Sequence, residues 1–134
     1  MDSSQITPNN VKVLVIEDEH FISELYNRAL VKGGYQVKTV VDGVEGLKEA
    51  ETDQYDVILL DLMIPNLTGA EVLNRLRNAE HPVHSKIIIA TNLEQGEDGR
   101  AAVEQKADGY IVKADITPRQ LVEFLDQLHI EARN

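Results

Sequence analysis

The feature that most constrains the fold of this chain is a strict alternation of short apolar runs with stretches of helical periodicity. The apolar runs, which are rich in β-branched residues, span residues 11–16, 35–40, 56–60, 86–90 and 109–112. A short apolar run with this composition is typical of a buried strand, and residues 35–40 alternate as a less buried strand does. Strict alternation of strands and helices predicts an α/β fold with a parallel sheet and helices on both faces.

Helical spacing of apolar residues predicts the other half of this pattern. The five predicted helices lie at residues 19–32, 44–52, 69–78, 93–106 and from Thr117 to Leu128. In the first, Phe21 and Leu25 belong to the predicted inward face, and two glycines at 33 and 34 end the helix. The last begins with Thr117-Pro118-Arg119-Gln120, which has the features of a capped helix start.

Length, charge and composition exclude several classes of protein. The chain has 134 residues, which predicts one domain over residues 11–131 after a flexible tail at residues 1–10. A net charge of −10 argues against direct binding to nucleic acid or to an anionic membrane. Without cysteine there is no thiolate nucleophile or disulfide, and no apolar stretch is long enough to span a bilayer. We therefore expect a cytoplasmic domain.

The residues that follow the predicted strands carry the chemistry. In an open parallel sheet the site lies beyond the carboxyl ends of the strands, where strand order reverses. Acidic residues Glu17, Asp18 and Glu19 end the first run, and Asp61, Thr91 and Lys113 end the third, fourth and fifth. Two carboxylates 4 Å apart repel by about 4 kcal/mol at an effective dielectric of 20, so such a cluster needs a cation.

Magnesium suits a site of carboxylates, water and a phosphate oxygen. Lys113 adds a fixed positive charge and Thr91 a hydroxyl donor, which together favour a tetrahedral dianion. Asp61 is the carboxylate placed centrally enough to attack phosphorus, and aspartate is a known phosphoryl acceptor. The pattern therefore predicts a phosphoaspartate site.

Four motifs carry a resemblance to a known family. They are residues 13–19 (VLVIEDE), residues 57–65 (VILLDLMIP) with Gly69, residues 87–91 (IIIAT) and residues 109–113 (GYIVK). In this order, each at the end of a predicted strand, they resemble the response-regulator receiver domain of two-component signalling, the chemotaxis-regulator type. The resemblance covers roughly residues 11–129 and implies a doubly wound, flavodoxin-like sheet of order 2-1-3-4-5 with five helices.

The resemblance also implies a role for each site residue. Asp61 is the phosphorylated aspartate, and Lys113 pairs with it. The ligands of Mg²⁺ are Asp61, Asp18, the backbone carbonyl of Met63 and, through a water molecule, Glu17. Thr91 and Tyr110 form the switch. The implied donor is a phosphohistidine on a sensor kinase or phosphotransfer protein. The implied output surface is the fourth helix, fifth strand and fifth helix, and activation could produce a homodimer. The implied function is a phosphorylation-controlled binding module in a phosphorelay, not an enzyme with a separate substrate.

Three positions depart from the family pattern. Ala114 follows the lysine where proline is common, which predicts the loss of a cis-proline bond. Asn92 follows the threonine where a small residue is usual and could restrict access to the site. Glu17 stands where aspartate is more frequent.

Two alternatives remain at the level of sequence. A pseudo-receiver would bind partners constitutively without phosphorylation, and Ala114 and Asn92 lend this slight support. A phosphatase of the haloacid dehalogenase type would carry a second aspartate two residues after the nucleophile, where this chain has Met63. That substitution argues against the enzyme.

Overall fold

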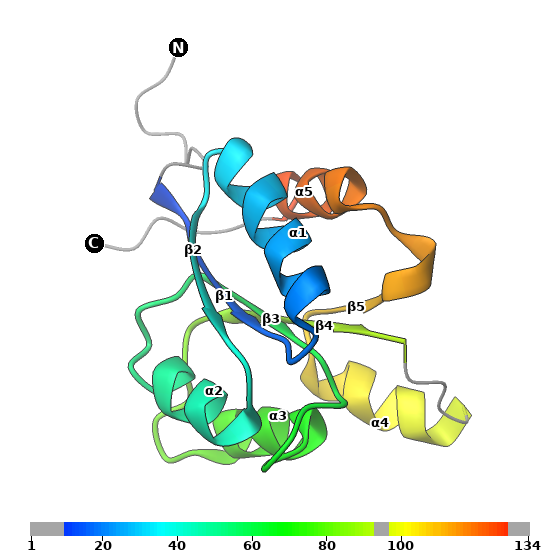
Figure 1. Ribbon diagram of the computed structural model, residues 1–134. Coiled ribbons are helices and arrows are strands. Elements are labelled where there is room, and N and C mark those ends of the chain that lie inside the picture. The colour runs from blue at the N-terminus through cyan, green and yellow to red at the C-terminus, as the bar shows by residue number, and fades with distance from the viewer. Residues whose placement is uncertain (1–9, 93–96, 129–134) are drawn as a thin grey trace.

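The computed structural model describes residues 10–92 and 97–128, apart from the side chains of residues 97–99. A five-stranded parallel sheet lies between two layers of helices (Figure 1). The predicted tail, the first part of the predicted fourth helix (93–96) and the end of the predicted domain fall outside the described residues, apart from residue 10.

The sheet has the predicted order β2-β1-β3-β4-β5, and all of its neighbouring strands are parallel. The strands are β1 (Lys12–Ile16), β2 (Gln36–Val40), β3 (Val57–Leu60), β4 (Lys86–Thr91) and β5 (Gly109–Val112). The helices are α1 (His20–Lys32), α2 (Gly43–Ala50), α3 (Gly69–Asn78), α4 (Glu97–Lys106) and α5 (Pro118–Asp126), with a short 3-10 helix, η2 (Lys113–Asp115), before α5. The parallel sheet with helices on both faces that the alternation predicts is confirmed, and so is the doubly wound strand order that the family resemblance implies.

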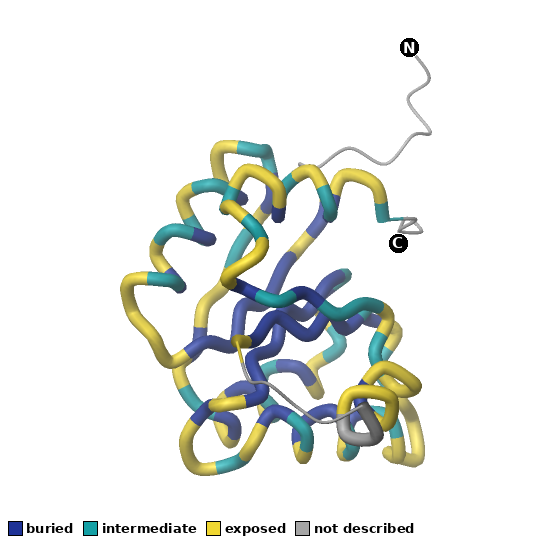
Figure 2. Tube along the Cα trace, turned by 90° about the vertical axis from the view of Figure 1, so that its right-hand side faces the viewer, coloured by how far each residue is buried: buried dark blue, intermediate teal, exposed yellow. Residues whose placement is uncertain are grey.

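The interior positions of the central strands are apolar because each face of the sheet meets a helical layer. Alternate residues of a strand point to opposite faces. In β3, Ile58 and Leu60 join the core under α2 and α3, whereas Val57 and Leu59 join the core under α1 and α5. The helices of each layer lie on the corresponding face in Figure 1, and the strands are the buried centre of the tube in Figure 2.

The ends of the helices show where the sequence patterns succeed. Thr117 Oγ1 accepts a hydrogen bond from the Gln120 N–H at 3.0 Å, and Gln120 Oε1 accepts one from the Thr117 N–H at 2.9 Å, so the predicted capping box is present. The α1 helix ends at Lys32 as predicted, and Gly34 then adopts φ 99°, a conformation that glycine reaches without strain.

Four details of the helix predictions are wrong. The α5 helix ends at Asp126, two residues before the predicted end at Leu128. The α1 helix begins at His20 because Glu19 has the extended backbone of an N-cap. Phe21 does not face the core; 73% of it is exposed. The α2 helix runs over Gly43–Ala50 instead of 44–52, because the Asp42 side chain accepts a hydrogen bond from the Glu45 N–H at 2.8 Å and starts the helix earlier.

The strand order places the functional residues. The chain leaves β1 toward β2 on one side and leaves β3 toward β4 on the other, so the connections after β1 and β3 diverge at the carboxyl edge. A doubly wound sheet forms its binding crevice at this reversal.

No helix within the described ranges is long and apolar enough to cross a membrane.

Candidate functional site

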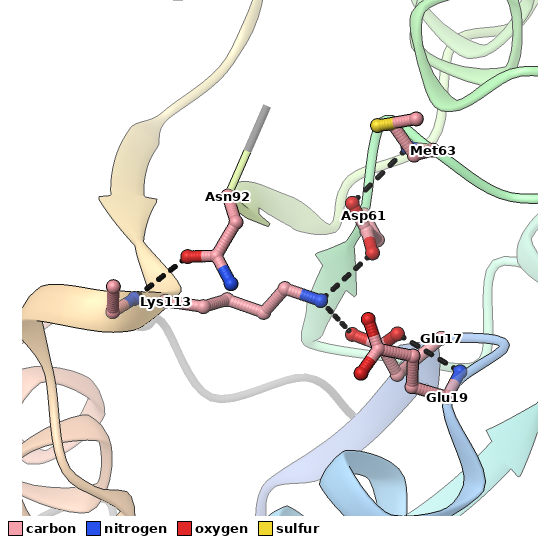
Figure 3. A network of polar contacts seen from close by, with 7 residues as sticks. Glu17, Glu19, Asp61, Met63, Asn92 and Lys113 are labelled. Carbon is pink, nitrogen blue, oxygen red and sulfur yellow. Dashed lines mark hydrogen bonds and ion pairs between the residues drawn. The ribbon is translucent and has the colours of Figure 1, made fainter. Parts of the chain in front are cut away.

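The site is organised around the Lys113 side chain, which reaches across the carboxyl edge of the sheet. Its Nζ donates hydrogen bonds to Asp61 Oδ2 at 2.9 Å and to Glu17 Oε1 at 2.7 Å (Figure 3). Lys113 follows β5, whereas Asp61 and Glu17 follow β3 and β1, and β4 lies between β5 and β3. One lysine therefore joins residues from both sides of the strand-order reversal.

These three charged groups are removed from water. The exposed fractions of the Lys113, Glu17 and Asp61 side chains are 4%, 3% and 5%. Burial on its own lowers the pKa of the Lys113 ammonium, but its hydrogen bonds to Asp61 and Glu17 outweigh burial and raise that pKa above the ordinary value. The ammonium is therefore positively charged at neutral pH.

The surroundings of Glu17 disfavour its charged form, whereas those of Lys113 favour the charged ammonium. Burial raises the pKa of the Glu17 carboxyl, and the negative charge of Asp61 raises it further. The hydrogen bonds from the Lys113 ammonium and from the Glu19 N–H (3.1 Å) lower that pKa but do not offset burial. The site thus holds more negative charge than its single ammonium balances.

Asp18 completes a cluster suited to a cation. Carboxylate oxygens of Glu17, Asp18 and Asp61 all lie within 4.8 Å of one another. Asp18 is exposed while the other two are buried, so the cluster is open to solvent on one side. Hard oxygen donors with room for water match the preference of Mg²⁺, and the excess negative charge favours a divalent cation. The donor set therefore fits Mg²⁺.

The open side continues into a pocket. A hollow of about 560 Å³ lies beside Asp18 and is bounded mainly by apolar residues of the segment after β3; its lining residues are Asp18, Leu62, Met63, Ile64, Pro65, Thr68 and Ala70. The pocket therefore borders the acidic cluster at Asp18.

The backbone after β3 fixes the position of Asp61. Its N–H donates to the Ile16 carbonyl at 3.1 Å, continuing the β1–β3 pairing beyond the strand. Its Oδ1 accepts a hydrogen bond from the Met63 N–H at 3.1 Å, while Oδ2 accepts from Lys113. Both carboxylate oxygens are therefore oriented by donors.

Thr91 and Tyr110 lie on neighbouring strands and on the same face of the sheet. Tyr110 is paired in register with Ile89, which is two residues before Thr91. Residues two apart in a strand share a face. Thr91 is buried; Tyr110 is partly buried, with the Arg100 guanidinium 4.4 Å from its ring centre. Burial raises the pKa of the Tyr110 hydroxyl.

The structure adds two contacts that the sequence patterns did not predict. Glu17 was expected to act through a metal-bound water, yet it also forms the buried ion pair with Lys113. The Ala114 N–H donates a hydrogen bond to Asn92 Oδ1 at 2.7 Å. No peptide bond in the described part of the chain is cis, in agreement with the loss of a cis-proline bond that Ala114 predicts. The sequence signal for Glu17 is an acidic residue at the end of a buried strand. Its pairing with Lys113, which follows a different strand, can be identified only once the fold is known.

Replacing Asp61 with asparagine is expected to raise the stability of the metal-free protein. The substitution removes one of three clustered carboxylates and leaves Lys113 paired with Glu17. We expect the free energy of unfolding to rise by about 1 kcal/mol, measured by thermal or urea denaturation with a chelator present. Destabilisation by more than about 1 kcal/mol would contradict the crowded-carboxylate argument.

Comparison with known proteins points to one family. Residues 13–126 match the family described as response regulator receiver domain. The chain is 38% identical over 112 residues to the alkaline phosphatase synthesis transcriptional regulatory protein PhoP of Bacillus subtilis, covering 84% of this chain and 45% of that protein. The chain thus spans about half the length of the curated relatives it matches.

Solved structures give the same result at the level of the fold. The receiver domain of the Francisella response regulator 1452 superposes with a TM-score of 0.77 at 28% identity, covering 87% of this chain and 94% of that one. The Vibrio cholerae chemotaxis protein CheY4 superposes with a TM-score of 0.76 at 28% identity, covering 89% and 98%.

Proposed function

This chain belongs to the response regulator receiver domain family, and from that premise we propose that Asp61 accepts a phosphoryl group from a phosphohistidine in a Mg²⁺-dependent reaction. One observation carries the proposal: the buried Lys113 ammonium holds Asp61 and Glu17 beside an exposed Asp18. Such an arrangement is costly as a purely structural element, because desolvation opposes each of its charges. It is well suited to bind a cation and a phosphoryl group.

In the proposed reaction an Asp61 carboxylate oxygen forms a bond to phosphorus while the bond from phosphorus to the donor's histidine nitrogen breaks. The Lys113 ammonium lies within hydrogen-bonding distance of Asp61 and is placed to neutralise charge on the transferring group. Glu17, Asp18, Asp61 and the Met63 carbonyl would hold Mg²⁺. When bound, Mg²⁺ supplies positive charge to the phosphoryl oxygens.

Thr91 and Tyr110 form the proposed switch. Their shared face of the sheet supports coupling between them, because a shift of Thr91 toward the new phosphoryl group changes the space beside Tyr110. The new charge would bias an equilibrium between two arrangements of this pair. We propose that the surface formed by α4, β5 and α5 then changes its affinity for an output partner.

The proposed partners follow from the same chemistry. The donor is a sensor histidine kinase or a histidine phosphotransfer protein, which places this domain in the cytoplasm. The relatives include a transcriptional regulatory protein, but this chain covers about half of it. With a net charge of −10, we propose that this domain does not itself contact nucleic acid and acts through protein contacts, including a homodimer on activation.

The pseudo-receiver alternative finds no support in these comparisons. The matched relatives are response regulators, and the acidic cluster, Lys113 and Thr91 are all retained at the carboxyl edge. Asn92 and Ala114, which favoured that alternative, are bound to each other by a hydrogen bond and leave the Asp61–Lys113 pair intact.

Phosphorylation can be tested with a small-molecule phosphodonor such as acetyl phosphate. With Mg²⁺ present, intact mass spectrometry should show one added phosphoryl group on the wild-type protein and none on Asp61→Asn. A chelator should largely suppress the addition. Equal labelling of the Asp61→Asn variant would place the phosphoryl group elsewhere and refute the proposal.

A further inference from the structure

The hydrogen bond between Asn92 and Ala114 joins the residues that directly follow two site residues. Asn92 follows Thr91 and Ala114 follows Lys113. The Ala114 N–H donates to Asn92 Oδ1 at 2.7 Å, and Figure 3 shows the Asn92 amide directed toward the chain at Lys113. Both residues are exposed, so the bond lies at the boundary between the buried charges and solvent.

This bond continues the sheet where its own pairing stops. The last registered pair of β4 and β5 is Thr91 with Val112. Just beyond that pair, the Asn92 side chain supplies a further link between the ends of the two strands. The Lys113 side chain must pass the end of β4 to reach Asp61, because β4 lies between β5 and β3. The link therefore spans the two strands beside the path of the Lys113 side chain.

We propose that Asn92 is a positioning residue that acts through Ala114 to keep the ends of β4 and β5 together over the phosphoryl site. This inference rests on the proposed phosphorylation of Asp61. Holding the two strand ends together keeps the Lys113–Asp61 pair, which is 4–5% exposed, shielded from water. The consequence for the phosphorylated domain is a slower hydrolysis of the aspartyl phosphate.

Two of the three departures from the family pattern, at positions 92 and 114, are then linked by one hydrogen bond. Proline lacks a backbone N–H and could not donate the hydrogen bond that Asn92 accepts. Alanine at position 114 supplies that donor, and asparagine at position 92 supplies an acceptor within reach. The hydrogen bond therefore requires an acceptor at position 92 and a residue other than proline at position 114.

A competing account assigns the effect to the size of Asn92 alone, as a cover over the site. The two accounts differ in their dependence on the Ala114 N–H. Asn92→Leu keeps a side chain of similar size but removes the acceptor, whereas Asn92→Asp keeps an acceptor. Ala114→Gly keeps the backbone donor, and Ala114→Pro removes it while also restricting the backbone of Lys113.

The experiment measures the half-life of the phosphorylated protein by intact mass after the small-molecule donor is removed, with melting temperatures recorded to verify folding. Asn92→Ala and Asn92→Leu should each shorten the half-life about three- to tenfold, the range expected for one lost hydrogen bond. Asn92→Ala should have the same effect in the Ala114→Gly background and none in the Ala114→Pro background. Asn92→Asp should remain closer to wild type than Asn92→Leu.

An effect of Asn92→Ala that is equally large in the Ala114→Pro background would overturn the inference. A wild-type half-life in Asn92→Leu would also overturn the inference, because it would assign the effect to the size of the side chain alone. This second outcome remains decisive if Ala114→Pro fails to fold. Wild-type protein that takes up no phosphoryl group would refute the proposed function and this role with it. Normal uptake with an unchanged half-life in Asn92→Ala would refute the positioning role alone.

Discussion

Replacing Lys113 with methionine is expected to lower the free energy of unfolding by about 3–5 kcal/mol at neutral pH, the usual cost of removing one partner from a buried ion pair. The side chains of Lys113, Glu17 and Asp61 are almost fully buried, so two carboxylates would lose their shared cation without gaining water. The proposed phosphorylation of Asp61 should also fall strongly, because the ammonium that we propose neutralises the transferring group would be absent.

The loss of stability should depend on pH in a defined direction. Burial already raises the pKa of Glu17 above 4.5, and the Lys113 hydrogen bond is the largest influence that lowers it. Removing Lys113 therefore raises the folded-state pKa further above the unfolded value. A group whose pKa is raised on folding loses its stabilising contribution as the pH rises through the folded-state pKa. The deficit should be largest at neutral pH and should shrink as the pH falls toward 4.5.

Lys48→Met provides the matched control, because Lys48 is exposed on α2. Its effect on stability should lie within about 0.5 kcal/mol. Urea denaturation of both variants and the wild type at neutral and acidic pH measures the difference. A Lys113→Met protein as stable as Lys48→Met at neutral pH would show that the buried carboxylates do not depend on the ammonium.

Replacing Gly69 with alanine is expected to cost about 3 kcal/mol or more and to disturb the position of Asp61. A Cβ at this position would lie 2.1 Å from the Asp61 carbonyl oxygen and 2.7 Å from the Leu62 Cα. Both are backbone atoms, so the clash cannot be relieved by a side-chain rotation. The start of α3 packs directly on the backbone of Asp61, the proposed phosphoacceptor, and glycine permits that approach.

Gly109→Ala is the control for this prediction. Its Cβ would meet Ile88 Cδ1 at 3.0 Å and Phe124 Cζ at 3.2 Å, which are ends of side chains that can move. We expect this variant to cost about 1 kcal/mol and to leave phosphorylation of Asp61 unchanged. Thermal denaturation and the phosphoryl mass assay measure both properties. Equal losses in the two glycine variants would contradict the close-approach argument.

Local patterns were sufficient to predict the alternating strands and helices of a parallel sheet, whereas the strand order followed from the family resemblance. The β3 and β4 runs are apolar along their length, as strands with helices on both faces must be, and Thr117 with Gln120 forms the predicted cap. The convergence of Glu17, Asp18 and Asp61 also followed from local patterns, since parallel strands end at the same edge.

Other features depend on distances that the sequence does not specify. The partner of Glu17 is 96 residues away, and the Asn92–Ala114 bond joins segments from two different strand ends. Phe21 lies on the side of α1 away from the buried Tyr26 and Leu30, whereas its neighbour Ile22 packs against the core. Apolar spacing within a helix is compatible with more than one inward face, and only packing against the sheet determines which face is buried.

In the proposed function, a divalent cation is held by three clustered carboxylates, two of which share the Lys113 ammonium. Thermal denaturation of the wild type and of Asp18→Ala with increasing Mg²⁺ tests it most directly, with Glu80→Ala as a control that removes an exposed acid after the C-terminal end of α3. Mg²⁺ at one hundred times its dissociation constant should stabilise the wild type and Glu80→Ala by about 2.7 kcal/mol and Asp18→Ala far less. Equal stabilisation of all three proteins would contradict the claim, because the metal would then bind elsewhere.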